Sequence, residues 1–500
     1  MIDIRNRYLY LITISIFGYI LSFLNQLVIS NFFGTSSNLD SFWAAVAIAN
    51  FLCFYVHPFR EALIPAIHQK SKISTHEAGE ILSAGLSFLI FLILISTLLL
   101  LIFPDSGIDF FMNGAGKAGS LKKLLPWFLP FLWLFGLSEL LNSVLLSFNR
   151  IVYQSVVRLV ASVVSLLLLI LMAPSFGTVA IIYGLLGSQL IVVAMSWYRL
   201  KDYPLTIKIR PIAVLKENNF FGLFGALLFN YLIAQFYVLS ERVSMVKLKL
   251  GLLSSFQYGT SLVNVLISVM AIPIANMLWH HFLESKVSGD HKSSSIYAAK
   301  MMGLLFILLL FICAFLYQHA QEFIYLIFSR GKFDQDSLIT TTQAFRATIF
   351  AAVPIGLLSI LAKFFLSLGR GRDSIYIGVS IALSGLLIIL ISLLLNNSMI
   401  IQWHWFFGNS VGLLVGLLMF YIKSNFTSRD LKKTIGFIGS GLLIFLLLFV
   451  FQPNFSFGHE KLMMFFALLT DFFSYLLFMV LLVLITRFWR SIKSLIEAFR

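Results

Sequence analysis

Long apolar runs, separated by short polar stretches, dominate this chain. Fourteen of them are long enough, at about 20 residues, to cross the hydrocarbon core of a bilayer as a helix. The sequence therefore predicts an all-α polytopic membrane protein with about 14 transmembrane helices. The runs cover residues 8–30, 41–64, 80–103, 124–148, 152–172, 177–199, 219–241, 251–279, 296–317, 341–368, 374–395, 400–422, 434–451 and 462–486.

The composition agrees with this pattern. Of the 500 residues, 59% are hydrophobic and 11% are charged, whereas soluble proteins are roughly 25% charged. A soluble globule is excluded, and the short connections leave no room for a soluble domain. The first run is too long for the apolar part of a signal peptide, so we expect a retained helix there.

Basic residues give the orientation. The net charge is +15, and 24 of the 36 basic residues fall in or beside the predicted inner loops, against 9 in the outer loops. Because cytoplasmic loops collect Lys and Arg, both termini are expected in the cytoplasm. The basic cytoplasmic loops of a membrane protein thus account for the positive net charge, and nucleic acid is not an expected partner.

Two short matches indicate an internal repeat. Residues 146–150 read LSFNR and residues 366–370 read LSLGR, and each pentapeptide ends one predicted helix and precedes another. Ser41-Phe42 and Ser255-Phe256 match at a similar offset. Duplicated helical bundles are typical of transporters.

The repeat divides the chain into four parts. We expect an N-lobe of six helices over residues 1–200 and a C-lobe of six helices over 219–424. The basic segment 201–218 between them is either an amphipathic strip on the cytoplasmic leaflet or a plain inner loop. Residues 425–500 would hold two further helices and a basic cytoplasmic tail.

Ionisable residues inside the predicted helices are the candidates for function, because burying a charge is costly and such groups usually face a cavity or a partner. The seven candidates for substrate binding and for ion coupling lie in five of these helices or at their ends. They are Arg60, Glu61, Glu139, Arg242, Arg346, Lys363 and Asp471.

Structural explanations compete with these roles. Arg60 and Arg158 could extend to the inner surface, and Glu139 could form a structural ion pair with Arg158. Asp471 has no partner evident from the sequence. His280 and His281 are adjacent, so they point in different directions on a helix and do not predict a metal site. We expect no cofactor, no metal and no catalytic residue.

Several motifs resemble a known family. They are Asn31-Phe-Phe-Gly34 with Asp40-Ser-Phe42 and Ile64-Pro65, then Ile327-Phe-Ser-Arg-Gly-Lys-Phe333, then Val353-Pro354 through Lys363 to Arg372. They resemble the MurJ/MviN lipid-linked precursor flippases of the MOP exporter superfamily. The resemblance implies two six-helix lobes in a V around a cationic cavity, with Asp40 and Lys363 at positions that the family also makes acidic and basic.

Three departures affect the expected substrate. The family's cavity arginines fall at Asn25, at about Cys53 and at about Ser261 in this sequence. We therefore expect first a flippase that moves an undecaprenyl-pyrophosphate-linked oligosaccharide, by alternating access, for surface polysaccharide. The alternatives are a lipid II flippase for peptidoglycan, a cation-coupled multidrug exporter and, from another class, a membrane glycan polymerase or ligase.

The chemistry of such a substrate explains why cations would be needed. A pyrophosphate head must cross about 30 Å of hydrocarbon, and Arg and Lys both suit phosphate. Arg60, Arg242, Arg346, Lys363, Asp40 and Glu61 are thus the candidate cavity residues, with Asp471 and Glu139 as candidate coupling groups. The expected partners are the lipid-linked glycan, membrane lipids and glycosyltransferases or a polymerase of the same pathway, in a bacterial cytoplasmic membrane.

Overall fold

The computed structural model describes residues 4–102, 118–201, 215, 220–288, 291–368, 370–423 and 461–485. Within these ranges every regular element is a helix, so the all-α prediction is confirmed. Parts of the expected linker (202–214 and 216–218) and the expected thirteenth helix (434–451) lie outside them.

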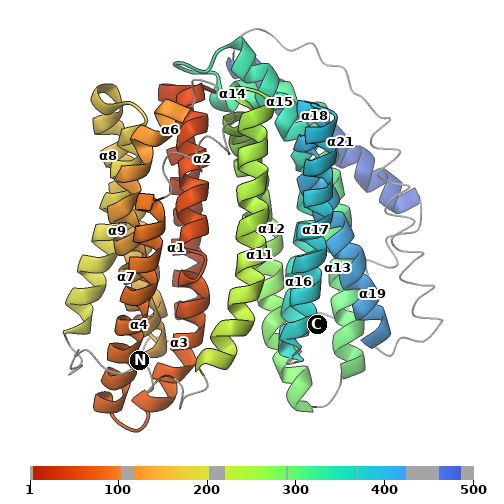
Figure 1. Cartoon of the computed structure of the whole chain (residues 1–500). Helices are drawn as coiled ribbons and strands as arrows, with labels where there is room; N and C mark the ends of the chain where they lie inside the picture. The colour runs from red at the N-terminus through yellow and green to blue at the C-terminus, as the bar shows by residue number, and fades with distance from the viewer. Residues whose placement is uncertain are drawn as a thin grey trace. The chain divides into compact units, whose positions relative to one another are not determined.

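Two compact units make up the chain: Met1–Ser254 with Gly331–Phe333, and Ser255–Arg330 with Asp334–Arg500 (Figure 1). The helix α12 begins at the boundary between them. The first unit contains α1 (Ile4–Phe33), α2 (Ser37–Leu52), α3 (Val56–Ser71), α4 (Thr75–Ile102), α6 (Ala118–Leu124), the 3-10 helix η1 (Leu125–Phe128), α7 (Leu129–Ser147), α8 (Ile151–Phe176), α9 (Val179–Leu200) and α11 (Phe220–Leu248). The second contains most of α12 (Leu252–Ser288), then α13 (His291–Gln318), α14 (Ala320–Phe328), α15 (Gln335–Ile349), α16 (Ala352–Ser367), α17 (Gly371–Leu394), α18 (Ser398–Gln402), α19 (His404–Lys423) and α21 (Lys461–Ile485).

Helix α11 falls on a different side of this division from the expected lobes. The sequence assigned residues 219–241 to the C-lobe, but α11 packs against α2 and α3 and groups with the first unit. Hydrophobic contacts explain the grouping, because Leu239 and Val243 of α11 form a buried cluster with Ala47 of α2.

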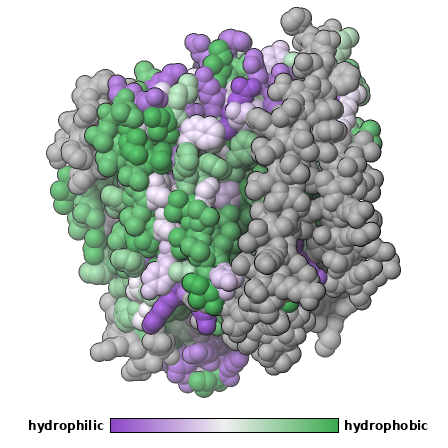
Figure 2. All heavy atoms as spheres, turned by 90° about the vertical axis from the view of Figure 1, so that its right-hand side faces the viewer, coloured by the Kyte–Doolittle hydropathy of each residue, from purple (hydrophilic) through white to green (hydrophobic). Residues whose placement is uncertain are grey.

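Many of the helices are suited to a bilayer. Among the described residues, 9 helices are long and apolar enough to cross a membrane, or 11 if two bent pairs each count as one span. The predicted number of 14 is not reached in that part of the chain. Figure 2 shows a face with hydrophobic residues across its middle and hydrophilic residues at both ends, as expected of a surface that meets lipid.

The two bent pairs replace two predicted single helices. The run 41–64 is divided into α2 and α3, and the run 341–368 into α15 and α16, each with a bend of 41°. Pro58 and Pro354 each occupy the third position of the second helix in the pair. Proline has no N–H to donate to the carbonyl four residues earlier, here that of Phe54 or Phe350, so the helix breaks there.

The two repeated pentapeptides end in the same backbone hydrogen bond. The N–H of Arg150 donates to the carbonyl of Leu145 (2.8 Å), and the N–H of Arg370 donates to that of Phe365 (2.9 Å). Each arginine then precedes the first residue of the next helix, α8 or α17. The similarity at an offset of 220 residues therefore extends from sequence to hydrogen bonding.

Candidate functional site

A buried carboxylate is the centre of the main polar cluster of the first unit. Glu139 of α7 is 7% exposed. The Arg60 Nη1 atom of α3 donates to its Oε2 at 2.6 Å, and Arg158 Nη2 of α8 lies 3.9 Å from its Oε1. Asn142, one turn along α7, approaches the same Oε1 at 3.5 Å. Charge neutralisation by two guanidinium groups permits Glu139 to be buried.

The cluster continues on the other side of Arg60. Its Nη2 atom lies 3.7 Å from Oε1 of Glu61, and the Tyr231 hydroxyl of α11 donates to that same oxygen at 3.1 Å. The His57 ring lies 5.9 Å from the Tyr231 ring. Two arginines and two glutamates thus alternate in a network without net charge, so the network holds α3, α7, α8 and α11 together electrostatically.

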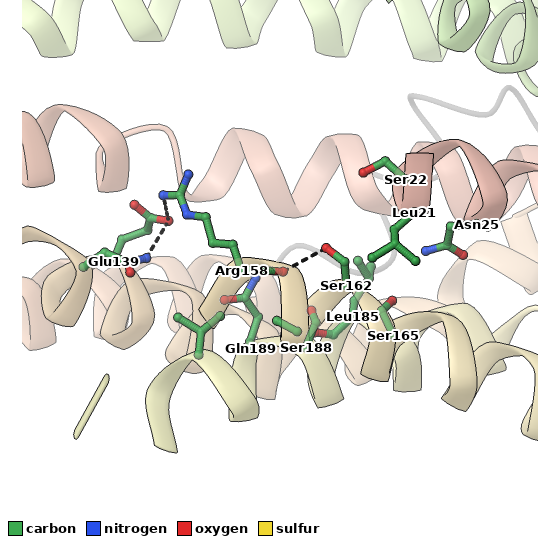
Figure 3. A pocket seen from close by; sticks show the side chains of 13 residues that line it. Leu21, Ser22, Asn25, Glu139, Arg158, Ser162, Ser165, Leu185, Ser188 and Gln189 are labelled. Atoms are coloured by element: carbon green, nitrogen blue, oxygen red, sulfur yellow. Dashed lines mark hydrogen bonds and ion pairs between the residues drawn. The ribbon is translucent and has the colours of Figure 1, made fainter. Parts of the chain in front are cut away.

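A cavity of about 330 Å³ adjoins Glu139 and Arg158, between α1, α7, α8 and α9. Figure 3 shows the Arg158 side chain extending toward Glu139, while Ser162 donates to the Arg158 carbonyl oxygen at 2.9 Å. Nine of the thirteen residues that line the cavity are polar. The wall consists of Ser22, Asn25, Glu139, Asn142, Arg158, Ser162, Ser165, Ser188 and Gln189, with Leu21, Ala161, Leu185 and Val192 as its apolar part.

Arg158 differs from Arg60 within this arrangement. The Arg158 side chain is 52% exposed and its ion pair is long, whereas the Arg60 side chain is 18% exposed and its ion pair is short. Arg158 is therefore the cation of the cavity wall that can turn toward an anionic ligand at little cost. Sequence reasoning treated Arg158 only as a surface or structural group. Its position eight residues into α8, near Glu139 of the preceding helix, was the signal available.

The predicted residues do not form a single site. Arg60, Glu61 and Glu139 lie in contact with one another. Glu139 also forms the ion pair with Arg158 that the sequence suggested as a structural alternative. Asn25, one of the positions where a family arginine was expected, lines the cavity beside them.

Asp40 and Arg242 lie elsewhere in the first unit. Both oxygens of Asp40 accept hydrogen bonds at the start of α12, from Gly251 N (2.6 Å), Ser254 N (2.8 Å) and the Ser254 hydroxyl. Asp40 is only 1% exposed. Through these hydrogen bonds its side chain caps the N-terminus of α12. The guanidinium of Arg242 lies 5.8 Å from the centre of the Trp43 ring.

The second unit holds the remaining candidates, each beside an aromatic ring. Lys363 Nζ lies 5.3 Å from the centre of the Trp279 ring. Arg346 lies 5.7 Å from that of Tyr317 and donates from Nε to the Tyr317 carbonyl oxygen at 3.3 Å. Asp471 lies near His319. Where residues are described, no three His, Cys, Asp or Glu side chains are grouped in a way that could hold a metal.

Comparison with known proteins decides the family. The family model described as "Lipid II flippase MurJ" matches residues 29–427, which is most of the chain. The chain belongs to the MurJ family. The family is one of flippases, so the chain is a membrane transport protein.

The solved structures agree with the MurJ family fold. The chain is 16% identical to a lipid II flippase MurJ in an inward closed conformation, with a TM-score of 0.76. The match covers 97% of this chain and 99% of the MurJ chain. An inward-facing multidrug resistance MATE family transporter follows at 14% identity and a TM-score of 0.62, covering 85% and 99%. A variant of the Vibrio cholerae MATE transporter VcmN follows at 13% identity and 0.59, covering 84% and 98%. No curated protein matches the chain.

Proposed function

We propose that this protein flips lipid II, the undecaprenyl-pyrophosphate-linked precursor of peptidoglycan, from the inner to the outer leaflet of a bacterial cytoplasmic membrane. The match of the MurJ family model to residues 29–427 carries the proposal. It reverses the order of the sequence-based expectations, which placed a surface-polysaccharide unit first because arginines are missing at Asn25, Cys53 and Ser261. The multidrug alternative has less support, since the MATE structures resemble the chain less closely than the MurJ structure.

The polar cavity of the first unit supports the transport of a polar head group. It offers one guanidinium, from Arg158, together with amide and hydroxyl groups from Asn25, Gln189 and several serines. A guanidinium binds phosphate oxygens through paired hydrogen bonds. Amides and hydroxyls both donate and accept, as sugar hydroxyls require. We infer that Arg158 is the phosphate-binding cation of this cavity and that it replaces part of the missing charge.

The proposed orientation has both termini in the cytoplasm, on the strength of the basic loops. Single cysteines at described positions can test it, because a membrane-impermeant maleimide labels outer positions only. Labelling from outside is expected near residue 332 and not near residue 72. The reverse labelling pattern would contradict the proposed orientation but would not bear on the proposed substrate.

Complementation tests the proposed substrate in cells. Expression of this protein should restore growth to bacteria depleted of their own lipid II flippase. Arg158→Ala should fail to restore growth at wild-type protein levels, while Arg158→Lys should restore it in part because the charge is kept. Arg199→Ala is the matched control, since Arg199 stacks on Tyr153 outside the cavity wall. Failure of the wild-type protein to complement would contradict the proposal.

A further inference from the structure

Asp471 is buried in the second unit without a compensating hydrogen bond. It lies near the middle of α21 and is 0% exposed. Neither carboxylate oxygen accepts a hydrogen bond from any residue that the structure describes. The neighbouring side chains form an apolar and aromatic cluster of Ile307, Phe311, Phe315, Leu468 and Tyr475. A bare carboxylate is costly in such surroundings, because the charge loses its hydration.

His319 is the group placed to relieve that cost. Its Nε2 atom lies 3.8 Å from Asp471 Oδ2, and it is 8% exposed. His319 occupies the break between α13 and α14, where it is the residue before the first turn of α14. Its ring packs against Phe315 at 4.8 Å between centroids. A small rotation of either side chain would therefore close a hydrogen bond between the imidazole and the carboxylate.

Other ionisable groups nearby define the electrostatic setting. α13 and α14 are the helices that pack against α21 here. Glu322 of α14 acts electrostatically on both Asp471 and His319, and Tyr475 follows Asp471 by one turn of α21. Lys461 lies ten residues from Asp471, about 15 Å along the helix, over the ring of Tyr325. The local balance of fixed charge is thus negative, which favours uptake of a cation.

The surroundings favour a proton over a metal ion. Hard cations such as Na⁺ or Ca²⁺ need several oxygen ligands, whereas the described neighbours of Asp471 are mostly phenyl, aliphatic and imidazole groups. A proton needs only one acceptor. Either Asp471 holds it as a carboxylic acid beside neutral His319, or His319 holds it beside the carboxylate.

We propose that Asp471 and His319 form a proton-binding pair that couples proton exchange to the position of α21; the transport role of the pair rests on the proposed flippase function. With one proton bound, the pair carries no net charge and α21 packs against the α13–α14 junction. Release of that proton to water leaves Asp471 charged in an apolar shell. That state favours separation of α21 from α14, which lets water reach the carboxylate.

Infrared difference spectroscopy tests proton binding without any substrate. A pH jump between about 8 and 5 in purified protein should produce a protonated-carboxyl band, or an imidazolium band, that Asp471→Asn removes. His319→Gln should shift that band. Ser474→Ala should leave it unchanged, since the Ser474 hydroxyl bonds within its own helix to the Thr470 carbonyl oxygen. A spectrum of Asp471→Asn identical to that of the wild type would overturn the proposal.

Transport separates this proposal from the proposed function. A one-unit pH gradient should change wild-type lipid II flipping by up to about tenfold for one proton, and Asp471→Asn should flip at a rate independent of the gradient. If Asp471→Asn flips lipid II with the same response to the pH gradient as the wild type, the proton-binding pair is rejected and the proposed flippase function stands. If the pair titrates in the infrared experiment but the protein flips no lipid II, the proposed flippase function is rejected and the pair stands as a proton-binding site. A dependence on Na⁺ in place of protons would also overturn the proposal.

Discussion

The backbone N–H of Lys332 donates a 2.9 Å hydrogen bond to the carbonyl oxygen of Asn31. This contact joins the end of α1 to the loop 331–333, within the first unit. Both segments belong to motifs by which the sequence resembles the MurJ family. The two glycines of these motifs, Gly34 and Gly331, have φ angles of +55° and +57°. The motifs thus mark a backbone contact between segments distant in the chain.

Replacing Gly331 with alanine should weaken this contact. A Cβ atom at Gly331 would lie 2.2 Å from the Asn31 carbonyl oxygen, and the left-handed backbone disfavours any side chain. We expect Gly331→Ala to lower the free energy of unfolding by about 1–3 kcal/mol, measured by thermal unfolding in detergent. Gly225→Ala is the control, because nothing lies within 4 Å of its Cβ position. Equal stability of the two variants would show that the contact is dispensable.

The two arginines beside Glu139 should differ in their effect on stability. Arg60→Ala leaves a buried carboxylate without its closest partner and should cost about 3–5 kcal/mol. Arg158→Ala removes a half-exposed side chain at 3.9 Å and should cost about 0–1 kcal/mol. Thermal unfolding of both variants measures the difference. The double variant Arg60→Met with Glu139→Leu should recover much of the loss, and a loss equal to that of Arg60→Ala would contradict the ion-pair explanation.

Lys363 should affect transport more than folding. Lys363 of α16 lies over the ring of Trp279 of α12, and we propose that its ammonium group binds the pyrophosphate of the substrate. Lys363→Ala should reduce lipid II flipping by about tenfold or more, as expected when a charge-assisted hydrogen bond is lost, while Lys363→Arg keeps most activity. Protein level and unfolding temperature should stay near wild type. Normal flipping by Lys363→Ala would show that the side chain serves only its stacking contact.

Asp334 should make the start of α15 sensitive to acid. Hydrogen bonds from the Ser337 side chain and backbone N–H hold the pKa of Asp334 below its usual range. Its stabilising contribution is therefore complete above about pH 3.9, the unfolded value, and is lost as the pH falls through the lower folded pKa. Hydrogen exchange at the Ser337 amide should accelerate over that acid range relative to Asp334→Asn, which keeps the cap without the charge. Equal pH dependence in both proteins would exclude this role.

The sequence predicted the class of fold well because apolar run length is set directly by bilayer thickness. It missed the breaks at Pro58 and Pro354, since both lie inside runs whose hydropathy is continuous. It placed Glu139 near Arg158, which follows it on the next helix, but not near Arg60, because that pairing depends on tertiary packing of α3 against α7. For the same reason the sequence did not predict that His319 lies near Asp471. The two are 152 residues apart and meet only when α21 packs on the α13–α14 junction.

The most direct test of the account is lipid II translocation in proteoliposomes that contain only this protein. Lipid II exposed on the donor leaflet should become accessible on the opposite leaflet, at a rate that Arg158→Ala lowers and Arg199→Ala leaves unchanged. An undecaprenyl-pyrophosphate-linked surface-polysaccharide unit should move more slowly under the same conditions. Translocation of the polysaccharide unit but not of lipid II would contradict the proposed substrate, and translocation of neither would contradict the flippase itself.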